Sequence, residues 1–270
     1  RTEELPNAKI DAYRKDNPDL LRIDDYLGNY FYRINVTHPA LKDKRVRHAL
    51  SQALDRQAIV ETVTRGGQKP AFAFTPPNTA GYTSRAQLKF DIEGAKKLLA
   101  DAGYPEGKGL PPIEIHYNTS ENHRAIAEAI QQMWKKNLGV DATLRNEEWK
   151  VYLDTQTATN YMVSRAGWIG DYPDANAFLE TFLSYSGNNR TGWANPEFDR
   201  LLQEAGCVSD VKQRTELLQQ AEALLLDEMP LLPIYFYTRV YLLNPAVKNW
   251  HANYQDHHPF KYVYLEAPAK

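Results

Sequence analysis

The sequence of 270 residues carries a formal net charge of −2, and 43% of its residues are hydrophobic while 24% are charged. This composition is typical of a globular protein with one large domain or two small ones, and its near-neutral balance argues against nucleic acid or an anionic membrane surface as a partner. Cys207 is the single cysteine, which excludes an internal disulfide and a cysteine-based zinc cluster.

The first stretch, RTEELPNAKIDAYRKDNPDLLRI, begins without Met and reads as the middle of a longer chain. We therefore expect the sequence to be a processed or excised piece of a larger protein. No run of about 18 consecutive apolar residues, the length of a membrane-spanning helix, occurs along the sequence.

Residues 43–65 carry apolar side chains at helical spacing, with a restart at Asp55, and two glycines end the pattern. Residues 69–82 contain a Pro-Pro pair and a glycine, which predict an aromatic-rich loop. The next helix is predicted between Asp91, its expected N-cap, and Gly103, its expected stop.

Alternating apolar residues predict strands over residues 112–118 and from Val140 on, and residues 123–139 between them have helical spacing. A short helix over residues 149–158 and a strand over residues 161–168 follow. Strand, helix and strand thus succeed one another along the chain, which is the order expected of α/β layers.

The remaining elements continue this alternation. One helix is predicted to open at Asp174, and a second to begin at the cap Asn195, with a proline in its first turn and Gly206 as its stop. A further helix over residues 215–230 precedes a long aromatic and β-branched strand over residues 231–245. The segment after it shows no clear period.

The sequence lacks the common catalytic motifs. The patterns GxSxG, HExxH, GxxxxGK[ST] and GxGxxG do not occur in it, which weighs against the commonest hydrolases and nucleotide enzymes. Carboxylates are plentiful, so an acid and base pair of the glycosidase kind stays open at this point.

Asp171 stands between two aromatic residues in SRAGWIGDYPDANAFLETF, at a predicted junction of strand and helix. One interpretation is a turn in which Gly170 adopts an unusual backbone angle, Pro173 fixes φ, and two aspartates cap the next helix. The other is a receptor for an ammonium group, because a carboxylate beside Trp168 combines an ion pair with cation attraction to the indole. The residues alone leave both interpretations open.

Trp149 and Trp168 both lie at the ends of predicted strands, and ligands of open α/β sheets bind at the carboxyl ends of strands. Both indoles would then line one cleft, although either alone is more often a core residue. His123 is either a surface histidine near a helix start or a group that suits a carboxylate. Arg165, inside a strand, needs a partner or a cleft.

Five stretches carry a resemblance to a known family. They are YFYRINVTHPALKDKRVRHALSQALDR, TPPNTAGY, AKKLLADAGYPEGKGLPPIEIHYNTSENH, AIQQMWKKNLGVDATLRNEEWKVYLD and RAGWIGDYPDANAFLETFLSYSGNNRTGWANPEFDRLL. In this order, and over nearly the whole chain, they resemble the oligopeptide-binding proteins of peptide ABC transporters.

This resemblance implies an α/β fold, namely one lobe of a type II periplasmic binding protein, with a mixed sheet flanked by helices. Family members are about twice as long as this chain, so an N-terminal lobe is expected to be missing. Residues 26–238 would form the C-terminal peptide-binding lobe. Residues 1–25 and the returning arm of residues 239–270 would pack on the missing lobe.

The resemblance also implies which residues bind the ligand. Asp171 matches a position that pairs with the α-ammonium of a bound peptide, and Trp168 and Trp149 match aromatic residues of its side-chain pockets. His123 and Arg165 match positions near the peptide's C-terminal carboxylate. Further cleft-lining matches are Asn118, Tyr26 and Tyr237.

The function implied is a non-enzymatic receptor in the periplasm, without a cofactor or a metal, that binds oligopeptides and hands them to an ABC permease. The alternatives are a receptor of the same family for a murein peptide, a dipeptide, a nickel complex or an oligosaccharide, and an α/β hydrolase. Gln156 departs from the family pattern, because some relatives carry Arg there, which puts recognition of ligand length at that position in question.

Overall fold

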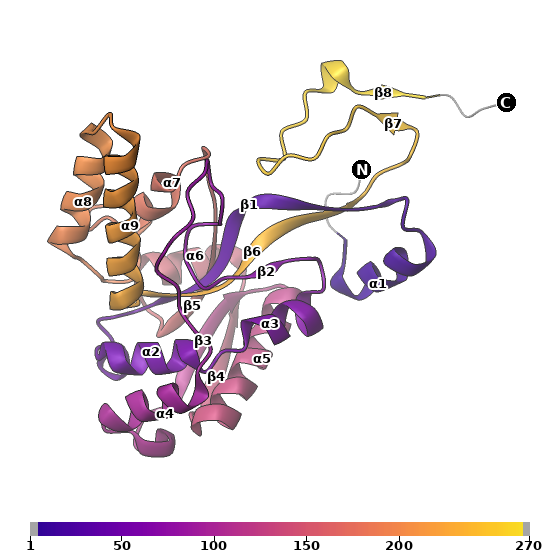
Figure 1. The fold of residues 1–270 in the computed structure, drawn as a ribbon. Coiled ribbons are helices and arrows are strands. Elements are labelled where there is room, and N and C mark those ends of the chain that lie inside the picture. The colour runs from indigo at the N-terminus through magenta and orange to yellow at the C-terminus, as the bar shows by residue number, and fades with distance from the viewer. Residues whose placement is uncertain (1–4, 267–270) are drawn as a thin grey trace.

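One mixed six-stranded sheet organises the chain in the computed structural model, which describes residues 5–266 (Figure 1). The strand order is β2-β6-β1-β5-β3-β4. The strands of this sheet are β1 (Leu21–Ile34), β2 (Lys69–Pro70), β3 (Ile113–Asn118), β4 (Ala142–Glu147), β5 (Val163–Ile169) and β6 (Leu231–Leu242). The α/β architecture with a mixed sheet confirms the predicted fold class.

The two longest strands, β1 and β6, lie side by side in the middle of the sheet although they are far apart in the sequence. β1 runs antiparallel to both β5 and β6, whereas β3 runs parallel to β4 and β5. No strand is predicted over β1, because its residues do not alternate between apolar and polar. Both faces of its second half are buried, so a continuous buried run replaces the alternation.

Helices cover both faces of the sheet (Figure 1). The α5 face, as we call it, packs against α2 (Lys44–Gln52), α4 (Ile92–Asp101) and α5 (Glu121–Leu138). The opposite face, the α9 face, packs against α7 (Asn176–Leu179), α8 (Pro196–Cys207) and α9 (Val211–Glu228). Side chains of one strand alternate between the faces, so Tyr30 and Tyr32 enter the first core and Phe31 the second.

Most helix ends follow the predicted signals. Asp91 Oδ1 accepts a hydrogen bond from the Gly94 amide at the start of α4, and Gly139, with φ of 71°, ends α5. The predicted stop at Gly206 is wrong by one residue, because α8 continues through it to Cys207. The restart at Asp55 is confirmed, since its side chain caps α3 (Arg56–Ala58), which continues as a π-helix over Ile59–Thr64.

The outer parts of β1 and β6 leave the two helical layers as a two-stranded ribbon (Figure 1). The register of the pair shifts between Asp25 and Asn29, where the ribbon begins. Beyond it lie α1 (Asn7–Asp16) and an arm that forms β7 (Val247–Lys248) and β8 (Tyr264–Leu265). The predicted lobe boundaries, before Tyr26 and after Thr238, therefore fall inside continuous strands.

A buried carboxyl group fastens the predicted aromatic loop to α9. Glu222 is fully buried, and its Oε1 accepts hydrogen bonds from the backbone amides of Phe74 and Thr75, both at 2.9 Å. Its Oε2 lies 2.8 Å from the hydroxyl of Tyr82. Burial raises the pKa of Glu222, although these hydrogen bonds lower it in part. The clamp holds the loop beside the ribbon without regular secondary structure.

Replacing Glu222 tests this clamp. Because the pKa is raised on folding, the carboxyl group stabilises the fold fully below its unfolded pKa, and the stabilisation is lost as pH rises through the folded pKa. Glu222→Gln keeps the acceptor for both amides, so it should remove this pH dependence and equal or exceed the parent at high pH. Glu222→Ala should cost about 2 to 4 kcal/mol, because two amides lose their acceptor. Urea unfolding between pH 5 and 9, with the exposed Glu216→Gln as control, measures both.

Candidate functional site

The carboxyl edge of the sheet is the candidate functional site. The strands β3, β4, β5 and β6 all end at this edge, and β1 enters the two helical layers here, because it runs antiparallel to its neighbours. Open α/β sheets bind their ligands at such an edge. The structure places the predicted ligand-binding residues along this edge, but distributes them over the two faces of the sheet.

Arg165 is the centre of a polar group on the α5 face. Its Nη2 donates to Tyr237 Oη at 3.0 Å, and its Nη1 donates to Asn118 Oδ1 at 3.4 Å. Its guanidinium carbon lies 4.9 Å from the ring centre of Tyr30, a cation–π contact. Within residues 5–266 it pairs with no carboxylate, and its Nε–H is buried without a partner. Two predicted residues, Asn118 and Tyr237, thus contact a predicted cation that can take a further acceptor.

His123 joins this group through a tyrosine. It lies in the first turn of α5, and its Nδ1 is 3.2 Å from Tyr30 Oη. Burial, and then the positive charge of Arg165, lower the pKa of His123 to about 3. The imidazole is therefore neutral at physiological pH and offers a ligand a hydrogen bond rather than a charge.

Trp168 lies on the α9 face, away from this group. Side chains three positions apart on a strand point to opposite faces, which separates Trp168 from Arg165. Its Nε1 donates to the carbonyl oxygen of Ala177 at 2.7 Å, and its ring packs against the second core while staying partly exposed. Trp168 is therefore a core residue with one open side.

Asp171 and Asp174 take different roles after β5. Asp174 accepts a hydrogen bond from the amide of Asn176 and binds both terminal nitrogens of Arg214, at 2.8 and 2.9 Å. Asp171 is exposed, and within residues 5–266 its carboxylate makes no hydrogen bond or ion pair. Of the two aspartates expected to cap the next helix, only Asp174 accepts a hydrogen bond from a backbone amide there, and the N-cap residue itself is Ala175.

Gly170 packs closely rather than bending the chain. Its φ lies outside the left-handed region, so the expected unusual backbone angle is wrong. A Cβ at this position would lie 2.9 Å from a ring carbon of Phe178 and 3.1 Å from Leu27 Cδ2, which explains the glycine. Its amide donates to the carbonyl oxygen of Leu27 at 2.9 Å and fixes the start of the turn that carries Asp171.

Trp149 opens α6 (Trp149–Thr157) on the α9 face and presents an open aromatic surface. Its side chain is 52% exposed and stacks on Tyr152, with ring centres 5.5 Å apart. The hydroxyl of Tyr152 donates to the carbonyl oxygen of Arg165, which ties α6 to β5. Trp149 is thus the most exposed of the four predicted aromatic residues, as expected of a surface that meets a ligand.

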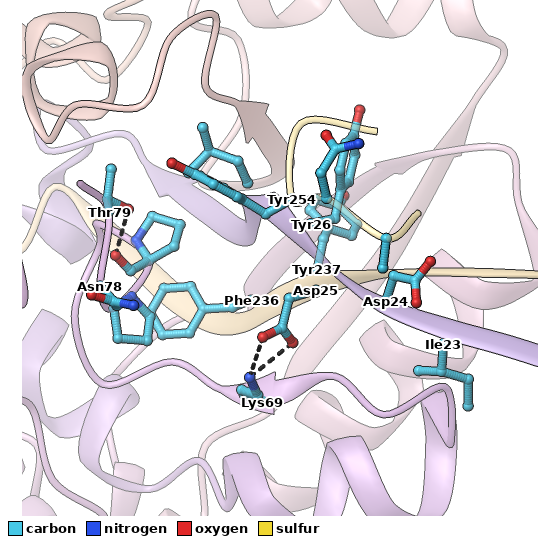
Figure 2. A pocket seen from close by; sticks show the side chains of 15 residues that line it. Ile23, Asp24, Asp25, Tyr26, Lys69, Asn78, Thr79, Phe236, Tyr237 and Tyr254 are labelled. Atoms are coloured by element: carbon cyan, nitrogen blue, oxygen red, sulfur yellow. Dashed lines mark hydrogen bonds and ion pairs between the residues drawn. The ribbon is translucent and has the colours of Figure 1, made fainter. Parts of the chain in front are cut away.

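Tyr26 and Tyr237 line a pocket of about 720 Å³ at the root of the ribbon (Figure 2). Its walls are β1, β6, the loop of residues 76–79 and the arm around Tyr254. The guanidinium of Arg239 lies 4.9 Å from the ring centre of Tyr26. Asp171, Trp168 and Trp149 do not line this pocket, so the predicted residues do not share one cavity.

Tyr30, which contacts both Arg165 and His123, is not among the predicted site residues. No local pattern marks it, because the residues of NYFYRI do not alternate between apolar and polar and both faces of β1 are buried there. Gln156 is buried and donates to Ser164 Oγ at 2.8 Å.

In the described part of the chain, no group of three or more His, Cys, Asp or Glu side chains could hold a metal ion, and no helix is long and apolar enough to cross a membrane.

Comparison with known proteins identifies relatives of the chain. Residues 2–190 match the family of bacterial extracellular solute-binding proteins, family 5, middle region. The oligopeptide-binding protein OppA of Bacillus subtilis is 41% identical over 253 residues, which are 91% of this chain and 46% of that protein. The periplasmic murein peptide-binding protein MppA of Escherichia coli is 39% identical over 259 residues, 93% of this chain and 48% of its own length.

Solved structures agree with these matches. The Escherichia coli murein tripeptide-binding protein MppA has a TM-score of 0.89 at 38% identity, covering 98% of this chain and 53% of that one. Haemophilus influenzae OppA in complex with RPPGFSPFR has a TM-score of 0.87 at 34% identity, with the same two coverages. The chain spans about half the length of the curated relatives it matches. It belongs to the family 5 bacterial extracellular solute-binding proteins.

Proposed function

We propose that this chain is the C-terminal lobe of an extracytoplasmic receptor that binds oligopeptides at the carboxyl edge of its sheet. In the two-lobed receptor, Asp171 pairs with the peptide's α-ammonium and Arg165 with its C-terminal carboxylate. Trp149 and Trp168 line side-chain pockets, and His123, Asn118, Tyr26 and Tyr237 complete the wall of the cleft. The receptor releases its peptide to an ABC permease.

The observation that carries the proposal is a pair of opposite charges, neither of which has a counter-charge among the described residues. Within residues 5–266, Arg165 has no carboxylate partner and Asp171 has no cationic partner. They stand six positions apart, Arg165 on β5 and Asp171 in the turn after it. A free peptide carries an ammonium at one end and a carboxylate at the other, so it would neutralise both.

The ribbon supports the assignment to one lobe of two. Residues 26–238 contain both cores, whereas residues 1–25 and 239–270 extend beyond the layers along β1 and β6. The arm exposes Phe260 and Leu265, each 76% exposed, together with Tyr262 at 60%. Apolar side chains gathered on such a segment suit contact with another domain, here the N-terminal lobe of the receptor.

The names of the relatives support peptides as the ligand class. They include receptors for oligopeptides, murein peptide and dipeptides. A murein peptide or a dipeptide therefore stays a candidate solute beside the general oligopeptide. Several of these relatives are named as periplasmic, which supports a location outside the cytoplasm. The chain's membership in a family of receptors supports a binding role without catalysis. Cleavage of a peptide incubated with the chain would contradict that role.

Arg165→Gln tests the carboxylate end of the site. In the two-lobed receptor it should weaken a tripeptide with a free carboxylate by about 1.5 to 3 kcal/mol, because a charge-assisted hydrogen bond is lost. The same tripeptide with a C-terminal amide should lose little. Arg124→Gln, on the exposed side of α5, is the matched control. Isothermal calorimetry gives the affinities, and an equal loss for both peptides would show that Arg165 only supports the fold.

The lobe alone should fold but bind peptide weakly. Without a second lobe, Asp171 and Trp149 stay open to water, and an exposed ion pair contributes only about 1 kcal/mol or less. Circular dichroism should show cooperative unfolding of the 270-residue chain, since both cores lie within it. Calorimetry with a tripeptide pool should then give a much lower affinity than the two-lobed receptor. Similar affinities would mean that the other lobe adds nothing to the site.

A further inference from the structure

Three buried arginines of this chain have no carboxylate partner within residues 5–266, and one of them differs from the other two. Arg47 and Arg56 have their hydrogen bonds supplied by the protein, because they donate to backbone carbonyl oxygens before and within α2, at the end of α9 and in β6. Arg33 of β1 is only 8% exposed, yet its Nε–H has no partner. Arg33 therefore keeps a hydrogen-bond donor without an acceptor, which an arginine with a purely structural role would not.

A second arginine meets Arg33 at the side chain of Gln156. Arg33 Nη1 lies 3.4 Å and Arg190 Nη1 3.5 Å from Gln156 Oε1, which is longer than a usual hydrogen bond. Arg33 Nη2 is 3.5 Å from the carbonyl oxygen of Asn188. Within residues 5–266 neither guanidinium has a carboxylate partner, so two positive charges face one neutral amide oxygen.

The surroundings hold these groups in place. Gln156 Nε2 lies 2.8 Å from each of Tyr152 Oη, Ser164 Oγ and the carbonyl oxygen of Arg165, which offer acceptors to both of its hydrogens, so its amide cannot turn away. Burial, together with the positive charges of Arg190 and Arg165, lowers the pKa of Arg33. Bringing two guanidinium groups together is unfavourable unless an anion compensates them.

From this geometry we infer that Arg33 and Arg190 form an anion subsite that takes a carboxylate side chain of the bound ligand, so that the receptor favours acidic peptides. The inference rests on the proposed peptide-binding function. A carboxylate accepts bidentate hydrogen bonds from a guanidinium, and here it would replace the long contacts to Gln156 with short charged ones. Arg190 is partly exposed and provides the approach from solvent.

The place of the subsite fits a ligand side chain. Trp149, Tyr152 and Gln156 occupy positions i, i+3 and i+7 of α6, which lie along one face of a helix. They lead from the exposed indole of Trp149 down to the two arginines. Arg33 and Trp168 project to the same face of the sheet, because β1 pairs Arg33 with Ser164 and Asn29 with Trp168. A peptide bound beside the two indoles would point a side chain toward Arg33 and Arg190.

A first experiment tests anion binding without any peptide. Sodium acetate is titrated into the 270-residue chain at constant ionic strength, and the ¹H–¹⁵N signal of Arg33 Nε is followed by NMR. We expect a saturable shift that disappears in Arg190→Gln and persists in Arg200→Gln, a control in an exposed ion pair. In Gln156→Glu an internal carboxylate should occupy the subsite and abolish the response. An unchanged Arg33 signal in the parent chain would overturn the subsite.

A second experiment separates a peptide side chain from a free anion as the natural occupant. Calorimetry on the two-lobed receptor compares tripeptides in which Glu or Gln stands in turn at each position. We expect one position at which Glu binds about 10- to 100-fold tighter than Gln, a preference that Arg190→Gln removes. Equal binding of Glu and Gln peptides at every position would overturn the acidic preference. No peptide binding at all, with acetate still bound at Arg33, would overturn the proposed function and leave only a free-anion site.

Discussion

The antiparallel pairing of β1 with β6 and β5 is the constraint on which the rest of this structure depends. It joins residues from the beginning and the end of the chain in the middle of one sheet. Through this pairing Tyr30 of β1 and Tyr237 of β6 come to lie against Arg165 of β5. The same two strands continue outward as the ribbon, so any movement of the ribbon begins beside the candidate site.

Several buried guanidinium groups of the described chain lack a counter-charge. At Arg47 and Arg56, backbone carbonyl oxygens accept the hydrogen bonds of the buried guanidinium group. At Arg165 and Arg33 this hydrogen bonding is incomplete, since the Nε–H of each is buried and has no partner. A buried cation whose hydrogen bonds are incomplete lowers stability and gains more from a ligand anion than a saturated one. Arg165 lies on the strand that leads to the exposed carboxylate of Asp171, whereas Arg33 pairs with Ser164 near the start of that strand.

Local signals in the sequence predicted much of the fold. Asp91 as a cap, Gly139 as a stop and the helical spacing through Trp134 each depend on neighbouring residues, which a sequence displays directly. β1 could not be predicted in this way, because burial of both its faces is decided by helices from distant parts of the chain. α8 ends at Cys207, one residue after the predicted stop at Gly206, because a single glycine within a packed helix is tolerated.

The candidate site was predictable in residue type and less so in arrangement. Resemblance to a family pointed to Arg165, Asn118, His123 and Tyr237, which do meet at one edge. It did not reveal that Trp168 faces away from Arg165, which follows from strand alternation once the register is known. The pairing of Arg33 with Arg190 spans 157 positions (190 − 33) and has no local signal at all.

The account rests on recognition of a peptide ammonium by Asp171, and a double-mutant cycle measures this directly. Calorimetry on the two-lobed receptor compares Asp171 with Asp171→Asn, and a free tripeptide with its N-acetylated form. Asp141→Asn, at the opposite edge of the sheet, serves as control. Each change alone should weaken binding by about 2 to 5 kcal/mol, and the second change should add little once the first is made. Equal binding of free and acetylated peptides to the parent receptor would contradict the account.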